Sequence, residues 1–184
     1  MGKALVDGAR HQKTLIAARD SVTAYLALGA NLGDAEAALR GAVQAIGQLP
    51  LTQVRKVSSL YRTAPLDTDA GREAAAPGTD YLNAVVEIET SLNALALLGE
   101  LQRLEGQAGR ERSHRNAPRT LDLDLLLFGS ACMASPRLTV PHPRMMQRAF
   151  VLVPLAEIAP SRVSAEALGA VKHQGVERLG RLAG

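Results

Sequence analysis

The sequence predicts an α+β fold, a ferredoxin-like βαββαβ sandwich with additions at its C-terminus. Four short apolar or alternating stretches are typical of strands, and two stretches with apolar residues at helical spacing lie among them. Their order along the chain is strand, helix, strand, strand, helix, strand, which is the split βαβ pattern. A chain of 184 residues is long enough for one domain with a substantial core. We therefore expect a single domain over residues 21–184, preceded by a flexible extension at residues 1–20.

The first strand and the first helix are predicted between residues 22 and 50. Val22 to Leu28 is a short apolar run that leads into Gly29–Asp34, where glycine, asparagine and aspartate are typical of a tight turn. Asp34 is a suitable N-cap, because its side chain can accept a hydrogen bond from the first turn of the helix. Apolar residues follow at helical spacing, and Pro50 ends the helix.

A long loop separates the next two predicted strands. The second strand is expected around Val54–Tyr61, and residues 62–80 are rich in proline, glycine and aspartate. Loops of this length are usually functional lids or disordered. Tyr81 to Thr90 alternates along the chain, so Tyr81 and Asn83 share one face directly after the loop. A ring beside an amide suits recognition of a flat heterocycle, although a tyrosine with a polar neighbour on a sheet surface is the simpler alternative.

The second half of the chain begins with a predicted helix. Asn93 to Glu105 is amphipathic, and Gly106 is its expected end. The remaining expected segments are a loop over residues 109–119, a strand over 121–128, a short strand over 137–140 and a helical run over 141–160. The tail after Ser161 contains no recognisable chemical motif.

Two aspartates lie side by side on the strand predicted over residues 121–128. Leucines alternate with Asp122 and Asp124, and residues two apart on a strand point to the same face, about 7 Å apart at Cα. Two carboxylates this close repel each other, and a hard divalent cation such as Mg²⁺ would relieve the repulsion and bridge to substrate phosphates. A solvated edge strand with two incidental aspartates is the alternative, and a lone DxD pattern does not exclude it.

A basic loop precedes this strand directly. Arg110, Arg112, His114, Arg115 and Arg119 fall within ten residues, among glycine, serine, asparagine and proline. Arginine binds phosphate oxygens in a bidentate manner, although basic surface residues are more often simply solvated. A guanidinium-rich loop leading into paired carboxylates indicates phosphate clamps beside metal ligands, the two parts of a polyphosphate site.

Composition narrows the class of protein. Apolar residues make up 47% and charged residues 21%, as in ordinary globular proteins, and 17 arginines against 4 lysines favour anion binding. Cys132 is the single cysteine, which excludes an internal disulfide and a cysteine-based metal cluster. No apolar run has the length of a transmembrane helix, and the N-terminal apolar run is too short for a signal peptide. We therefore expect a cytoplasmic protein.

Five stretches, taken in order, resemble the motifs of the 6-hydroxymethyl-7,8-dihydropterin pyrophosphokinase family. They are YLALGANLG at 25–33, SLYRT at 59–63, YLNA at 81–84, APRTLDLD at 117–124 and LTVPHP at 138–143. The resemblance covers about residues 22–160 and is far more specific than a single DxD. It implies an enzyme of folate biosynthesis that transfers diphosphate from ATP to the hydroxymethyl group of the pterin and releases AMP.

The resemblance also implies site residues and partners. Asp122 and Asp124 would hold two Mg²⁺ ions, and together with Arg110 and Arg119 they would be the catalytic residues. The expected pterin-binding residues are Thr63, Leu66, Tyr81, Asn83 and Phe150. The expected nucleotide-binding residues are Gln102, Glu105, Arg112, Arg119, Leu125, Arg137, Thr139, His142 and Arg148. The implied partners are ATP and a pterin, with no nucleic acid and no membrane, and the protein is expected to be a monomer.

Two other functions fit parts of the sequence. A nucleotidyltransferase also has a glycine-rich turn after its first strand and a later DxD, but it releases pyrophosphate rather than AMP. An RNA-binding module of ferredoxin-like type needs exposed aromatic residues for base stacking. The characteristic aromatic motif of such modules is absent, and five aromatic residues are few for that role.

Overall fold

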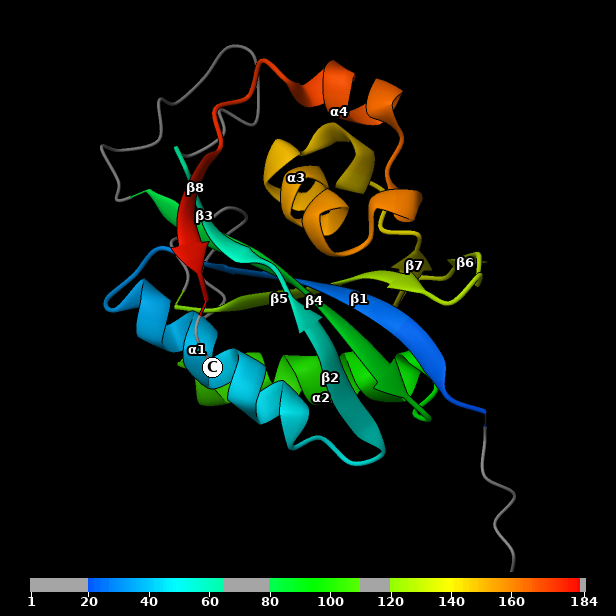
Figure 1. The fold of residues 1–184 in the computed structure, drawn as a ribbon. Helices are drawn as coiled ribbons and strands as arrows, with labels where there is room; N and C mark the ends of the chain where they lie inside the picture. Colours follow the sequence, from blue (N-terminus) through cyan, green and yellow to red (C-terminus); the bar gives the residue numbers. More distant parts are fainter. Residues whose placement is uncertain (1–19, 65–79, 110–119, 183–184) are drawn as a thin grey trace, which may run out of the picture.

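The computed structural model describes residues 20–64, 80–109 and 120–182. One antiparallel sheet lies between two layers of helices, with α1 and α2 on one face and α3 and α4 on the other (Figure 1). The mixed helix and antiparallel-sheet class predicted from the sequence is therefore confirmed. The strands are β1 (Val22–Ala30), β2 (Thr52–Val57), β3 (Ser59–Thr63), β4 (Tyr81–Thr90), β5 (Asp122–Phe128), β6 (Met133–Ala134), β7 (Thr139–Val140) and β8 (Glu177–Arg181). The helices are α1 (Ala35–Gly47), α2 (Ala94–Gln107), α3 (Ala149–Ile158) and α4 (Ala165–Val171), with 3-10 turns η1 (Met145–Gln147) and η2 (Pro160–Arg162).

The strand order of the main sheet is β5-β1-β4-β3-β8, and β2 also pairs with β4. Every pairing in it is antiparallel. Strand β1 therefore has β5 on one side and the central strand β4 on the other. Strands β6 and β7 form a separate hairpin. This order places the aspartate-bearing strand and the strand with Tyr81 and Asn83 on either side of β1.

The second predicted strand is split in two at Ser58. Its hydroxyl accepts a hydrogen bond from the N–H of Val85 at 2.9 Å and donates to the carbonyl of Ser59 at 2.8 Å. The backbone N–H of Ser58 also donates to the carbonyl of Val85 at 2.9 Å. Because the serine side chain takes part in the ladder, β2 and β3 each pair with a different half of β4.

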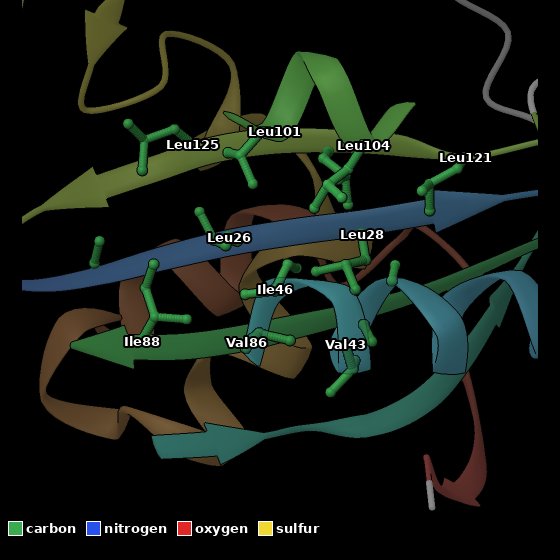
Figure 2. Packing of buried hydrophobic residues seen from close by; sticks show 14 of the residues in the cluster. Leu26, Leu28, Val43, Ile46, Val86, Ile88, Leu101, Leu104, Leu121 and Leu125 are labelled. Carbon is green, nitrogen blue, oxygen red and sulfur yellow. The ribbon is translucent and has the colours of Figure 1, made fainter. Parts of the chain in front are cut away.

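The core consists of two apolar clusters, one on each face of the sheet. Figure 2 shows the first, in which leucines of β1 and β5 pack against Ile46 of α1 and Leu101 of α2. The second packs Val85 and Leu126 against Leu152 and Leu155 of α3. Each fully buried leucine contributes about 2 kcal/mol by leaving water. The sheet therefore has buried side chains on both faces, which makes its strands fixed supports for a site.

The predicted start of α1 is confirmed by the structure, and the predicted end of α2 is not. Asp34 caps α1 as predicted, with its carboxylate accepting from the N–H of Ala37 at 3.0 Å. The predicted end of α2 at Gly106 is wrong, because the helix continues to Gln107 and the left-handed residue that follows is Gly109, with φ +85°. Gly29 was expected in the turn before α1 but lies within β1, and Gly33, with φ +60°, takes the turn position.

None of the helices among the described residues combines the length and the apolarity that crossing a membrane requires.

Candidate functional site

Asp122 and Asp124 lie on the face of β5 that is turned towards α3. Leu121, Leu123 and Leu125 point the other way, into the cluster under α1 and α2. The predicted alternation is wrong beyond that point, because the register of β1 and β5 shifts between Tyr25 and Leu26. As a result Leu126 and Leu127 both join the cluster under α3, while Phe128 packs with the opposite cluster. The bulge lies beyond the aspartates, so their shared face is kept.

Asp124 lies close to a histidine and an arginine from the segment that precedes α3. Its Oδ2 is 3.9 Å from Nε2 of His142 and 3.9 Å from Nη1 of Arg148. Burial lowers the pKa of His142, and Arg148 and Arg144 lower it further, which together outweigh the opposing effects of Asp124 and Asp122. His142 is therefore neutral at pH 7. Its Nδ1 accepts from the N–H of Arg144 at 3.2 Å, so the proton is on Nε2 and faces the carboxylate.

Arg148 connects the carboxylate to an aromatic ring. Its guanidinium carbon lies 5.4 Å from the ring centroid of Phe150, within the range of a cation–π contact. The same side chain approaches Asp124. The charged and the aromatic parts of the expected site therefore meet at one residue.

Thr63, Tyr81 and Asn83 come together at the ends of β3 and β4. Thr63 pairs with Tyr81 across the two strands, so the three side chains share the α3 face. The Asn83 amide donates to Oγ1 of Thr63 at 3.0 Å and, more weakly, to the carbonyl of Tyr81 at 3.4 Å. Asn83 is 5% exposed and Thr63 is 6% exposed. The sheet therefore holds the amide in one orientation beside the tyrosine.

Gly29 joins the two halves of this site. It pairs with Asp122 on one side and with Asn83 on the other, so these three residues form one row across the sheet. Two strand spacings put Asp122 and Asn83 about 10 Å apart. A Cβ at Gly29 would lie 3.5 Å from Oδ1 of Asn83, which is ordinary contact. The glycine therefore leaves bare backbone between the carboxylate and the amide.

The carboxylates of Asp122 and Asp124 are suitable ligands for a magnesium ion. No cluster of three or more histidine, cysteine, aspartate or glutamate side chains is present in the described segments. Magnesium is usually held by one or two carboxylates and completes its shell with water and substrate phosphates. The Asp124 side chain is 38% exposed, so its oxygens are accessible to such an ion.

Glu105, expected at the nucleotide, is buried between α2 and β5. It is 3% exposed, and its Oε1 accepts from the N–H of Leu123 at 2.9 Å. That N–H lies between the two aspartates in sequence, on an edge strand. The Glu105 carboxylate therefore supports the backbone of β5 that carries Asp122 and Asp124.

The other expected site residues either make no side-chain hydrogen bond or ion pair with the site or lie outside the residues that the structure describes. Within the described part of the chain, no side-chain hydrogen bond or ion pair involves Gln102, Arg137 or Thr139. The Leu125 side chain is in the core, so only its backbone faces the site. The loops expected over residues 62–80 and 109–119 lie outside the described residues except at their ends, and Leu66, Arg110, Arg112 and Arg119 lie outside them too.

One hydrogen-bonded carboxylate between α3 and β3 was missed by the sequence reasoning. Glu157 of α3 accepts from the backbone N–H of Ser59 at 2.9 Å, from the Ser59 hydroxyl at 2.7 Å and from the Tyr61 hydroxyl at 2.8 Å. Arg178 of β8 donates to the same carboxylate at 3.2 Å. Burial together with this carboxylate raises the pKa of Tyr61 to about 12. A single glutamate within the apolar run of α3 was the available signal.

We expect Glu157→Gln to lower stability at pH 7 and to have less effect in acid. Burial raises the pKa of the Glu157 carboxyl, but hydrogen bonds from Ser59, Tyr61 and Arg178 outweigh it and hold the pKa below its ordinary 4.5. A lowered folded-state pKa contributes stability above 4.5 that is lost as the pH falls through the folded value. The loss at pH 7 should be on the order of 2 kcal/mol. Chemical denaturation at pH 7 and pH 4 measures it.

The control for this comparison is Glu166→Gln, which changes an exposed carboxylate at the start of α4. It should differ from wild type by less than about 0.5 kcal/mol at both pH values. A gap between wild type and Glu157→Gln that stays constant down to pH 4 would contradict the assignment of the lowered pKa.

The comparisons with known proteins agree with one another. The family model 7,8-dihydro-6-hydroxymethylpterin-pyrophosphokinase (HPPK) matches residues 25–160. A 2-amino-4-hydroxy-6-hydroxymethyldihydropteridine pyrophosphokinase of Haemophilus influenzae is 46% identical over 142 residues, covering 77% of this chain and 84% of the relative. The enzyme of the same name from Bacillus subtilis is 48% identical over 151 residues, covering 82% and 86%.

A solved structure supports the fold. The crystal structure of a triple mutant of Plasmodium falciparum HPPK-DHPS matches with a TM-score of 0.60 at 15% identity, over 80% of this chain and 41% of that one. This chain therefore spans less than half the length of the HPPK-DHPS chain. At this identity the likeness shows a shared fold.

Proposed function

Because the chain belongs to the 7,8-dihydro-6-hydroxymethylpterin-pyrophosphokinase family and transfers diphosphate from ATP to 6-hydroxymethyl-7,8-dihydropterin in folate synthesis, we propose that the α3 face of the sheet is where it does so. The observation that supports this placement is the row formed by Asp122, Gly29 and Asn83. A polyphosphate at the carboxylates and a heterocycle at the amide would then lie over one strip of backbone. The hydroxymethyl group of the pterin would point along this strip towards the phosphates.

The pterin half of the proposed site contains Thr63, Leu66, Tyr81, Asn83 and Phe150. Asn83 would hydrogen-bond the polar edge of the pterin, and Thr63 supports it by accepting one of its amide protons. Tyr81 and Phe150 would cover the two faces of the ring. Arg148 already lies over one face of Phe150, so the pterin is expected on the other.

The phosphate half centres on Asp122 and Asp124. Members of this family use ATP and magnesium, and we propose that these carboxylates hold two magnesium ions. When bound, the metal supplies positive charge that polarises the phosphate oxygens. Arg148 adds a guanidinium beside Asp124, and the neutral His142 presents an N–H in the same direction. The guanidinium and the Nε2–H of His142 both donate hydrogen bonds, which suits binding of phosphate oxygens.

The remaining nucleotide contacts are proposed from the resemblance. Glu105 is proposed to act through the backbone of β5 rather than on the nucleotide, because its carboxylate is bound to the N–H of Leu123. The other proposed phosphate, nucleotide and catalytic contacts are Gln102, Arg110, Arg112, Arg119, Leu125, Arg137 and Thr139.

We expect Tyr81→Ala and Phe150→Ala each to weaken pterin binding more than nucleotide binding. Either change removes one stacking surface, worth on the order of 1 kcal/mol beyond the area buried, or about fivefold in Kd. Calorimetric titration with the pterin and with a non-hydrolysable ATP analogue measures the two affinities separately. An equal fall in both affinities would show that these rings do not form a separate pterin pocket.

We also propose a ferredoxin-like unit within a single domain over residues 21–184, preceded by an extension at 1–20. The order β5-β1-β4-β3 with antiparallel pairing supports this description. A monomeric cytoplasmic enzyme without nucleic-acid or membrane partners is proposed as well, and sedimentation at micromolar concentration would test the monomer.

The reaction is tested by its products. Wild-type protein incubated with ATP, Mg²⁺ and 6-hydroxymethyl-7,8-dihydropterin should form AMP and the pterin diphosphate in equal amounts. Release of pyrophosphate with transfer of AMP would instead indicate a nucleotidyltransferase.

A further inference from the structure

The side chain of Gln174 holds the backbone on both sides of Arg148. Its Oε1 accepts from the N–H of Ala149 at 2.8 Å, and its Nε2 donates to the carbonyl of Gln147 at 2.8 Å. Gln174 lies in the link between α4 and β8, and its own N–H donates to the carbonyl of Val171 at 2.9 Å. Gln174, 26 positions further along the chain, therefore binds the backbone on both sides of Arg148.

Arg148 needs such support because of its place in the chain. It is the single residue between η1, which ends at Gln147, and α3, which begins at Ala149, and its backbone is extended at φ −125° and ψ 109°. The first N–H groups of a helix have no partner within the helix. No side chain at the N-cap position of α3 supplies one, since Arg148 itself occupies it. The Gln174 amide fills this role and fixes the helix start at the same time.

We propose that Gln174 is a positioning residue for diphosphate transfer, acting through Arg148 and Phe150. This inference rests on the proposed site. Arg148 approaches Asp124 at 3.9 Å and lies 5.4 Å from the Phe150 centroid, and Phe150 follows in the first turn of α3. The backbone between η1 and α3, which Gln174 binds, sets the direction in which the side chains of Arg148 and Phe150 project. Gln174 therefore fixes the arginine against the carboxylates and the ring against the pterin.

The variant that tests this role is Gln174→Met, which keeps the length of the side chain and removes both hydrogen bonds. Gln174 borders an open cavity of about 540 Å³ between α3 and α4, so the methionine has room. A displacement of about 1 Å at a reacting site costs on the order of 100-fold. We expect kcat/KM to fall about 10- to 100-fold, with a higher KM for the pterin and a lower kcat.

Two further variants give this measurement its controls. His173→Ala changes the exposed neighbouring residue, which has no side-chain hydrogen bond among the described residues, and should retain wild-type kinetics. Gln174→Glu keeps the acceptor for Ala149 but replaces the donor to Gln147 with an oxygen that repels that carbonyl, so its kcat/KM should also fall below that of wild type. If Gln174→Met does not fold, Gln174→Glu is the variant that tests the positioning role. Wild-type kinetics in Gln174→Glu would then overturn the proposal.

A double-mutant cycle distinguishes positioning from a general loss of stability. In a Phe150→Ala background, Gln174→Met should change the pterin Kd less than twofold, because the ring it orients is already gone. Additive losses, or wild-type pterin KM and kcat in Gln174→Met at a temperature where it is fully folded, would overturn the inference. The same assay on wild type reports AMP formation, so failure of the proposed site and failure of the Gln174 role give different results.

Discussion

Replacing either Asp122 or Asp124 with asparagine should lower turnover about 100- to 10,000-fold. Each change removes one charged ligand at the site that fits magnesium, while the shape of the side chain is nearly kept. A metal stabilises the charge of the transition state by several kcal/mol, and each 1.36 kcal/mol corresponds to a factor of ten in rate. Because the interaction is strongest in the transition state, kcat should fall along with kcat/KM.

The rates are measured as AMP formed at saturating ATP and pterin over a range of Mg²⁺ concentrations. Glu166→Gln is the control, since it neutralises an exposed carboxylate of α4, and it should retain the wild-type rate. Turnover within threefold of wild type in both aspartate variants would exclude the carboxylate pair as the metal site.

The second large effect is expected at Asn83. Asn83→Leu keeps the branched shape of the side chain, though in a larger volume, and removes the amide that β4 presents beside Tyr81. A site built to hydrogen-bond its substrate loses far more than the bond when its polar group is removed, because the polar edge of the pterin is then buried without a partner. We expect kcat/KM for the pterin to fall about 100-fold or more, with the affinity for an ATP analogue within twofold of wild type.

Thr90→Val is the matched control for Asn83→Leu. Thr90 is a buried polar residue at the far end of the same strand, and its hydroxyl lies 2.8 Å from that of Thr52. The control should lose stability and leave the pterin KM unchanged. A pterin KM that rises equally in both variants would mean that Asn83 acts through the stability of β4 rather than through the substrate.

The features that the sequence predicted well depend on local periodicity. The shared face of Asp122 and Asp124, and that of Tyr81 and Asn83, follow from alternation along one strand, and the N-cap at Asp34 follows from a three-residue pattern. Each depends on residues only a few positions apart, so no knowledge of the tertiary structure was needed.

The features that were missed depend on contacts between distant parts of the chain. Glu157 is 98 positions from its partner Ser59, and Gln174 holds the start of α3 from the tail that showed no motif. The bulge in β5 and the division of the second strand at Ser58 arise from pairing with neighbouring strands, which alternation within one strand does not reveal. Gly29 was interpreted as a turn residue because its neighbours in sequence are typical of turns, whereas its neighbours across the sheet give it its place in the site.

We propose that Asp122 and Asp124 form a metal site rather than a structural ion-pair network. Asp124 is 38% exposed and lies 3.9 Å from its two cationic neighbours. Exposed pairs of this kind contribute about 0–1 kcal/mol, and asparagine also relieves the repulsion between the two carboxylates. A change of 1 kcal/mol shifts the melting temperature by about 2–4 °C for a chain of this size.

The direct test is the melting temperature of wild type, Asp122→Asn and Asp124→Asn in a chelating buffer without metal. If the two aspartates hold metal, the melting temperatures should be within about 4 °C of wild type, or higher, in variants whose turnover has collapsed. A structural network would leave a buried charge unpaired and cost about 3–5 kcal/mol. A fall of about 8 °C or more with activity largely kept would contradict a metal site at Asp122 and Asp124.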